Sequence, residues 1–184
     1  MEQSKVTLEI WGWVKSLLIG LAIALFIKIF IFSPYTVQGA SMEPTLQNEE
    51  RLFVNKFTAF TDSFNRGDVI IIKRPEETER YVKRIIGLPG DTIQMDNDQL
   101  YVNGEKIEEN YLQENRLAAK QQSMKLTEDF GPIEVPTGNY FVMGDNRLVS
   151  MDSRNGLGFI EESTIIGKAQ FVMMPIKKMR FVEK

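Results

Sequence analysis

The sequence predicts a mainly β domain with antiparallel pairing, preceded by one N-terminal transmembrane helix. Two observations carry this prediction. A long apolar run lies near the start of the chain, and residues 16–27 (SLLIGLAIALFI) carry no charge. Beyond it, short apolar or β-branched runs recur between turn residues, which is typical of antiparallel sheets. The chain has 184 residues, and the part after residue 35 is long enough for one well-buried domain.

The apolar run is long enough to cross a bilayer. Residues 11–32 number 22, and a helix of that length covers ~33 Å, against a hydrocarbon core of ~30 Å. Trp11 and Trp13 stand at its start and Tyr35 follows it, where interfacial anchors belong. A buried core helix and a cleavable signal peptide are the alternatives, although residues 38–40 (QGA) imitate a cleavage site poorly.

The charges before the run favour a cytoplasmic N-terminus only slightly, because its two lysines are matched by two glutamates. The expected organisation is therefore a short cytoplasmic N-terminus, a membrane-spanning anchor and an extracytoplasmic β-rich domain, with boundaries at residues 1–10, 11–32 and 33–184.

Nine short runs account for the expected strands of the domain. They lie between residues 35 and 183 and read YTVQG, RLFVN, DVIIIK, RYVKRII, DTIQM, QLYVN, NYFVMG, IIGKAQFVMM and MRFVE. Asn103-Gly104 predicts a tight hairpin between two of the strands. The polar stretch 108–126 is rich in Gln and Glu and is expected to be a surface excursion with some helix.

Four phenylalanines follow one another at helical spacing. Phe53, Phe57, Phe60 and Phe64 share one face if this stretch is helical. Core packing is one interpretation of that face, and an apolar patch that leans on the membrane is the other.

The chain contains no histidine and no cysteine. Their absence excludes a Ser-His-Asp triad, a Cys-His nucleophile, a disulfide and a His/Cys zinc site. Any hydrolytic chemistry must therefore use Ser, Thr, Lys, Asp, Glu or Tyr. The near balance of 22 basic and 25 acidic residues, net −3, argues against a general nucleic-acid binder.

Lys83 is the candidate base for such chemistry. A lysine with a pKa of ~10.4 is neutral in only about one molecule in 2,500 at pH 7, but burial lowers the pKa by up to ~3–5 units. In a strand, Lys83 shares a face with Tyr81 and Ile85, while Arg84 points to the other face, where it can meet a carboxylate. An amphipathic strand with a snorkelling lysine explains the same segment.

Ser41 is the candidate nucleophile, within VQGASMEPTL. Gly39 allows the close backbone approach that an extended substrate needs, and Pro44 ends any strand. A structural serine in a loop explains the same pattern. Ser41 stands nine residues beyond Phe32, so it lies at most ~30 Å of extended chain from the bilayer edge, where peptides emerge.

A third dense segment, MGDNRLVSMDSR, begins at residue 143. Asp145, Arg147, Asp152 and Arg154 alternate in sign along it. One interpretation is a row of surface ion pairs, which contributes little to the stability of the fold. The other is a fixed scaffold behind a site, with Ser150 free to hydrogen-bond a neutral lysine amine.

Together the three segments resemble the signature boxes of bacterial type I signal peptidases, in the short single-span form typical of Gram-positive bacteria. GxSMxPTL, KRIIGLPGD and GDNRxxSxDSR occur in the order of that family, and RGDVIIIK resembles a fourth, weaker box. With the N-terminal run, the resemblance covers essentially the whole chain. It implies a β catalytic domain of the type shared with the self-cleaving SOS-response repressors.

The resemblance implies a membrane-anchored serine endopeptidase, a hydrolase that cleaves signal peptides from exported preproteins. Cleavage is expected at the outer face of the cell membrane, after small residues at the −1 and −3 positions. The implied protein is single-pass, with a cytoplasmic N-terminus and an extracytoplasmic catalytic domain. Its expected partners are preprotein signal peptides and the lipid bilayer, and neither a cofactor, a metal nor nucleic acid is expected.

By motif, Ser41 corresponds to the nucleophile of a Ser-Lys dyad and Lys83 to its general base. Ser150 corresponds to a residue that orients the lysine amine. The Ser41 backbone N–H is expected to donate to the oxyanion. The supporting ion pairs implied by the family join Asp145 to Arg84, and Asp152 to Arg154.

Substrate binding is expected near Gly39 and Met42, where shallow pockets accept the small side chains. This chain departs from the family pattern at two places. Leu148-Val149 stands where many members have Asp-Asn, which bears on the conformation of that loop. Gly39 stands where some members have a serine that assists the oxyanion hole, so that task is left to backbone donors and water.

Two other function classes fit parts of the sequence. A self-cleaving repressor-like domain needs DNA-binding helices where this chain has its apolar run. A non-catalytic, membrane-tethered β module that binds exported chains needs neither Ser41 nor Lys83. Turnover of a preprotein separates the enzyme from the binding module.

Overall fold

The computed structural model describes residues 2–26, 32–59, 61 and 64–183. It contains an N-terminal helix, α1 (Glu2–Phe26), a shorter helix, α2 (Gln113–Gln121), and strands that form two sheets. The strands are β1 (Phe32–Thr36), β2 (Arg51–Asn55), β3 (Val69–Ile72), β4 (Tyr81–Gly87), β5 (Thr92–Asp96), β6 (Gln99–Val102), β7 (Glu105–Ile107), β8 (Phe130–Glu134), β9 (Asn139–Met143), β10 (Ile160–Glu161), β11 (Ile165–Met174) and β12 (Arg180–Phe181).

Helix α1 carries exposed apolar side chains on all sides, including Trp13 and the neighbours Leu17 and Leu18. Within the described residues, no helix combines enough length with enough apolar character to cross a membrane. The predicted span 11–32 includes residues 27–31, which lie outside the described part of the chain.

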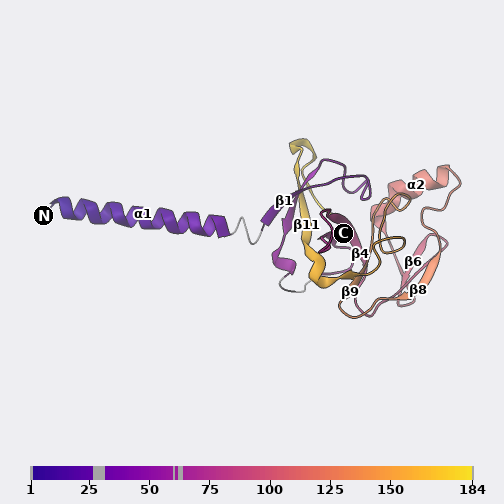
Figure 1. Ribbon diagram of the computed structural model, residues 1–184. Helices are drawn as coiled ribbons and strands as arrows, with labels where there is room; N and C mark the ends of the chain where they lie inside the picture. The colour runs from indigo at the N-terminus through magenta and orange to yellow at the C-terminus, as the bar shows by residue number, and fades with distance from the viewer. Residues whose placement is uncertain (1, 27–31, 60, 62–63, 184) are drawn as a thin grey trace.

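Two antiparallel sheets build the β domain. The larger sheet has the order β1-β2-β11-β3-β4-β9-β10, with β12 paired to β11, and the smaller has the order β7-β6-β5-β8. Figure 1 shows β6, β8 and α2 at one end of the domain, and β1 and β11 at the other. The prediction of a mainly antiparallel β domain is confirmed, since every strand pair in both sheets is antiparallel.

Tight turns with positive φ set the register of the smaller sheet. The predicted hairpin at Asn103-Gly104 is present, with φ of 53° and 81°, and it joins β6 to β7. Asn97-Asp98 makes a second two-residue turn, with φ of 50° and 61°, between β5 and β6. Both central residues of a type I′ turn need positive φ, which Asn, Asp and Gly tolerate best.

Three apolar clusters hold the sheets together. One lies among β2, β3 and β11, and the second lies among β3, β4 and β9. The third joins the two sheets, because Ile86 of β4 and Phe141 and Met143 of β9 pack against side chains of the smaller sheet such as Ile93. Strand β4 is therefore covered on both faces, which fixes the strand that carries Lys83.

Three expectations about the elements need correction. The predicted strand at residues 35–39 forms earlier, as β1. Strands β8 and β10 were not predicted, because Gly131-Pro132 interrupts the apolar residues of β8 and β10 has only two residues. Residues 53–64 do not form one helix. Phe53 lies in β2, Phe57 begins a single 3₁₀ turn, Phe64 is buried in the second cluster, and Phe60 lies outside the described residues.

Candidate active site

Ser41 and Lys83 meet although 42 positions separate them in the chain. The Lys83 Nζ and Ser41 Oγ atoms are 2.7 Å apart, a hydrogen-bond distance. Lys83 is fixed by β4, which pairs with β3 through residues 81–84. Ser41 lies in a compact loop after β1, where the Glu43 and Leu46 N–H groups donate to carbonyls three and four residues back.

Burial makes the neutral form of the Lys83 amine far more abundant than it is in water. The side chain is 3% exposed, so the interpretation of a snorkelling surface lysine is wrong. Desolvation disfavours the ammonium and lowers the pKa of Lys83 from 10.5 to about 8, assisted by the Arg154 charge and opposed by the carboxylates of Asp152 and Asp145. About one Lys83 in ten is then neutral at pH 7.

Arg84, next to Lys83, forms a fully buried ion pair with Asp145. The guanidinium donates from Nε and Nη2 to the two carboxylate oxygens at 2.8 and 2.7 Å, and both side chains are 0% exposed. Its Nη1 donates to the Gly67 and Glu183 carbonyls at 2.8 Å. This bidentate geometry ties β4 to the segment after β9, and it keeps the Arg84 charge compensated on the face away from Lys83.

The second expected pair, Asp152 with Arg154, is also present. Both guanidinium donors lie 2.8 Å from the carboxylate, which also accepts from the Gly144 N–H at 2.9 Å. Burial raises the pKa of the Asp152 carboxyl, but the Arg154 hydrogen bonds and charge outweigh it and hold the pKa below its ordinary value. Because Asp145, Arg147 and Asp152 are buried, the segment is no surface ion-pair ladder.

Ser150 lies in the same segment as Asp145 and Asp152, but its hydroxyl makes no hydrogen bond to Lys83. Its Oγ is buried, and it has no hydrogen-bond partner of normal geometry among the described residues, although its nearness helps to keep the pKa of Asp152 low. A Cβ on Gly144 would stand only 2.3 Å from the Ser150 Oγ and 2.4 Å from the Ser41 carbonyl oxygen. Glycine is therefore required where these two segments touch.

The expected substrate-binding residues lie on either side of Ser41. Gly39 is exposed, has a φ of +83° and faces open space, while its N–H donates to the Asn48 Oδ1 at 2.9 Å. Met42 is buried in the first apolar cluster at 1% exposure, so its side chain is part of the core beneath the Ser41 loop. Leu148 and Val149 are exposed, at 53% and 64%.

The strand before the Ser41 loop and the strand that carries Lys83 each have an edge open to an added strand. Among the described strands, β1 pairs only with β2, at the end of the larger sheet. Strand β4 pairs with β9 only from Arg84 onward, so among the described residues its first three positions have a sheet partner on one side only. The Ser41 N–H likewise donates no hydrogen bond within the described chain.

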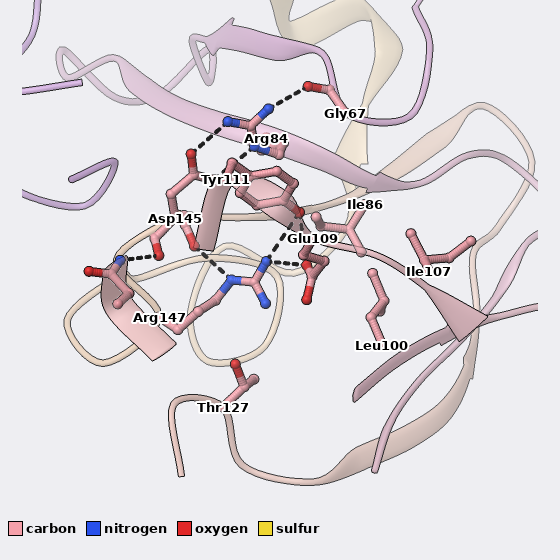
Figure 2. A network of polar contacts seen from close by, with 12 residues as sticks. Gly67, Arg84, Ile86, Leu100, Ile107, Glu109, Tyr111, Thr127, Asp145 and Arg147 are labelled. Atoms are coloured by element: carbon pink, nitrogen blue, oxygen red, sulfur yellow. Dashed lines mark hydrogen bonds and ion pairs between the residues drawn. The ribbon is translucent and has the colours of Figure 1, made fainter. Parts of the chain in front are cut away.

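A second buried network lies beside the first, and sequence reasoning missed most of it. Glu109 is 1% exposed and accepts from Arg147 Nη2 at 2.5 Å and from Arg116 Nη2 at 3.2 Å. The Tyr111 hydroxyl donates to Glu109 at 2.8 Å, and the Arg84 guanidinium lies 3.8 Å above the Tyr111 ring. Figure 2 shows this chain of contacts running from Gly67 through Arg84 and Tyr111 to Glu109 and Arg147.

Because residues 108–126 are mostly polar, the sequence did not indicate these buried contacts. The expected helix is present as α2, but Leu112, Ala119 and Leu126 form a small apolar cluster, and Glu109 and Asn115 reach the dyad loops. Their sequence offers only one weak signal, the apolar pair Tyr111-Leu112 inside a polar stretch. An isolated Glu or Asn carries no mark of burial until its distant partner is known.

Comparison with known proteins agrees with this geometry. The family described as "Signal peptidase, peptidase S26" matches residues 10–174. A signal peptidase I of Bacillus licheniformis is 53% identical over 172 residues, which cover 94% of this chain and 92% of that protein. The signal peptidase I T of Bacillus subtilis is 52% identical over 168 residues, covering 91% and 87%.

A solved structure is similar as well. The crystal structure of a signal peptidase I from Enterococcus faecalis has a TM-score of 0.50 and 36% identity, and the match covers 58% of this chain and 96% of that one. The family match over most of the chain, the identity to these relatives and the shared fold lead to one conclusion. This chain belongs to the signal peptidase family, peptidase S26, a family of serine peptidases.

Proposed function

We propose that this protein is a membrane-anchored serine endopeptidase that removes signal peptides from exported preproteins with a Ser41–Lys83 dyad. One observation carries the proposal: the buried Lys83 amine lies 2.7 Å from the Ser41 hydroxyl, in a chain without histidine. A serine needs a base to become a nucleophile, and a lysine serves once its pKa is lowered. The relatives named signal peptidase I support the substrate class.

In the proposed reaction, the neutral Lys83 amine accepts the hydroxyl proton as the Ser41 Oγ attacks the scissile carbonyl carbon. The Ser41 N–H donates to the developing oxyanion, which its lack of an internal acceptor favours. The Lys83 ammonium then protonates the leaving amine of the mature protein. Water, deprotonated by Lys83, hydrolyses the ester that joins the signal peptide to Ser41.

Supporting residues have separate tasks in this proposal. Arg84 and Asp145 hold β4 against the loop that follows β9, and Asp152 with Arg154 shapes that loop beneath the dyad. Ser150 is proposed to orient the Lys83 amine when substrate is bound; its buried hydroxyl has no hydrogen-bond partner of normal geometry among the described residues and is available for that bond.

Substrate selection is proposed to depend on size rather than on charge. An extended preprotein segment pairs with the open edges of β1 and of residues 81–83 through main-chain hydrogen bonds, which give affinity without reading the sequence. Pockets near Gly39 and above Met42 then admit small side chains at −1 and −3. Ala or Gly at −1 is cut, and Phe or Lys at −1 blocks cleavage.

The apolar N-terminal segment is proposed to anchor the enzyme. Residues 11–32 form the single span, residues 1–10 lie in the cytoplasm and residues 33–184 form the extracytoplasmic catalytic domain. Two features support this: the apolar run itself and the exposed apolar side chains around α1. Recovery of the full chain in the membrane fraction after a high-pH wash tests the anchor.

The decisive experiment is cleavage of a purified preprotein, with the N-terminus of the product sequenced. Wild type should give one new N-terminus, after a small −1 residue. Ser41→Ala and Lys83→Ala should each lose activity by several orders of magnitude, because the two groups act as a unit. Binding of the preprotein without turnover supports the tethered binding module instead, and half of the activity in Lys83→Ala refutes the base.

A further inference from the structure

We propose that Asn115 is a positioning residue for the Ser41–Lys83 dyad. The inference rests on the proposed dyad function and adds a residue that lies outside all the signature segments. Asn115 lies in α2, in the polar stretch 108–126. Its side-chain Nδ2 donates to two backbone carbonyls, those of Glu43 and Asp145, at 2.9 Å each.

The two acceptors belong to the two loops that form the site. Glu43 lies two residues after Ser41, and Asp145 is the partner of Arg84, the neighbour of Lys83. One planar amide thus joins the loop of the nucleophile to the segment that is tied to the strand of the base. Loop backbone without a sheet partner needs such links to hold a fixed position.

Within the part of the chain that the structure describes, two other hydrogen bonds join these loops. The Asn146 N–H donates to the Ser41 carbonyl at 3.0 Å, and the Thr45 hydroxyl donates to the Asp145 carboxylate at 2.5 Å. Both of these links come from within the two loops themselves. Asn115 is different because it reaches them from a helix, so it sets their position against a rigid element.

The chemistry of the contact selects asparagine. Both partners are carbonyl oxygens, so the group between them must supply two N–H donors and no acceptor. The amide of Asn115 does so with a short side chain. A carboxylate of the same size would place its oxygens against two carbonyl oxygens, and alanine would leave both carbonyls without this donor.

The helix that carries Asn115 is itself well anchored. Glu109, just before it, is clamped by Arg147 and Arg116, and the Tyr111 ring packs against Arg84 (Figure 2). Burial and the Glu109 carboxylate raise the pKa of the Tyr111 hydroxyl, so it remains a donor to Glu109 at all working pH values. Asn115 therefore projects from a support that is fixed to the strand of Lys83.

The test compares kcat, KM and the pH profile of preprotein cleavage in Asn115→Ala, Asn115→Asp and Asn115→Gln. Lys120→Ala, an exposed change on the same helix, is the matched control. Asn115→Ala should lower kcat by about 10- to 100-fold, the cost of misplacing a reacting group by roughly 1 Å, with KM nearly unchanged. Asn115→Asp should lose at least as much, and Asn115→Gln, which keeps both donors, should retain more than Asn115→Ala.

The pH profile separates positioning from simple stabilisation. A loosened dyad admits water to Lys83, so the kinetic pKa of the base should move upward from about 8 in Asn115→Ala. Thermal unfolding of each variant, with kcat measured well below its midpoint, removes the effect of unfolded enzyme.

The outcomes distinguish this inference from the proposed function. If Ser41→Ala is inactive while Asn115→Ala has the kcat and pH profile of wild type, the positioning role is refuted and the dyad stands. A lowered unfolding midpoint with unchanged kcat also refutes it, since Asn115 is then only structural. If Ser41→Ala remains active, the dyad itself is wrong.

Discussion

Replacing Lys83 with methionine should stabilise the protein at pH 7 while abolishing cleavage. Methionine has a similar length and no charge, so the change removes the desolvation of a buried ammonium without leaving a large cavity. Lys83 is 3% exposed, and its pKa is lowered from 10.5 to about 8. The folded state therefore binds fewer protons than the unfolded state between these two values, and stability from this group rises with pH through that window.

The magnitude follows from the two pKa values. Below pH 8 both states are largely protonated, so the full cost is present, and at pH 7 it amounts to about 3 kcal/mol. Loss of the hydrogen bond to Ser41 offsets about 1 kcal/mol of the gain. Lys83→Met should thus be more stable than wild type by about 2 kcal/mol at pH 7.

The assay is urea unfolding of wild type and Lys83→Met at pH 7 and pH 9, with Lys120→Met as an exposed control. The difference between Lys83→Met and wild type should shrink by about 1 kcal/mol between the two pH values, because wild type gains stability as Lys83 loses its proton. The free energy of unfolding of Lys120→Met should equal that of wild type at both pH values. The same difference at pH 7 and pH 9 would falsify the lowered pKa, and a destabilised Lys83→Met at pH 7 would refute the burial argument.

Two further predictions concern the rate and the buried pair. For wild type, kcat/KM should rise about tenfold per pH unit up to about pH 8 and then level off, because the active form has a neutral Lys83; a profile centred below pH 6 would indicate a carboxylate base. Asp145→Asn should cost about 3–5 kcal/mol of stability, because it leaves the Arg84 charge buried and unpaired, and it should also slow cleavage. Asp129→Asn, which breaks the exposed pair with Lys125, should leave the urea midpoint nearly unchanged, and equal effects of the two changes would contradict the role given to burial.

Local sequence patterns predicted most of the fold. Short apolar runs such as RLFVN and NYFVMG became β2 and β9, the first alternating and the second buried along most of its length, and both patterns are typical of strands. Asn103-Gly104 predicted its hairpin because the turn requires positive φ at adjacent residues. Irregular or short strands such as β8 and β10 were not predicted, because they form by pairing with distant strands and their own residues carry little strand pattern.

The sequence by itself determined the chemical possibilities: without histidine or cysteine, hydrolytic chemistry was left to Ser, Thr, Lys, Asp, Glu or Tyr, and the signature segments indicated Ser41 and Lys83. Tertiary structure alone decided that Lys83 is buried and 2.7 Å from Ser41, that the Arg84–Asp145 pair is fully enclosed, and that Asn115 joins their two loops. The physical reason is that desolvation and hydrogen bonding depend on distance in space. Contacts between residues 30 to 100 positions apart produce no periodic pattern in the sequence. A polar residue such as Asn115 is therefore predicted to lie at the surface unless its partners in the fold are known.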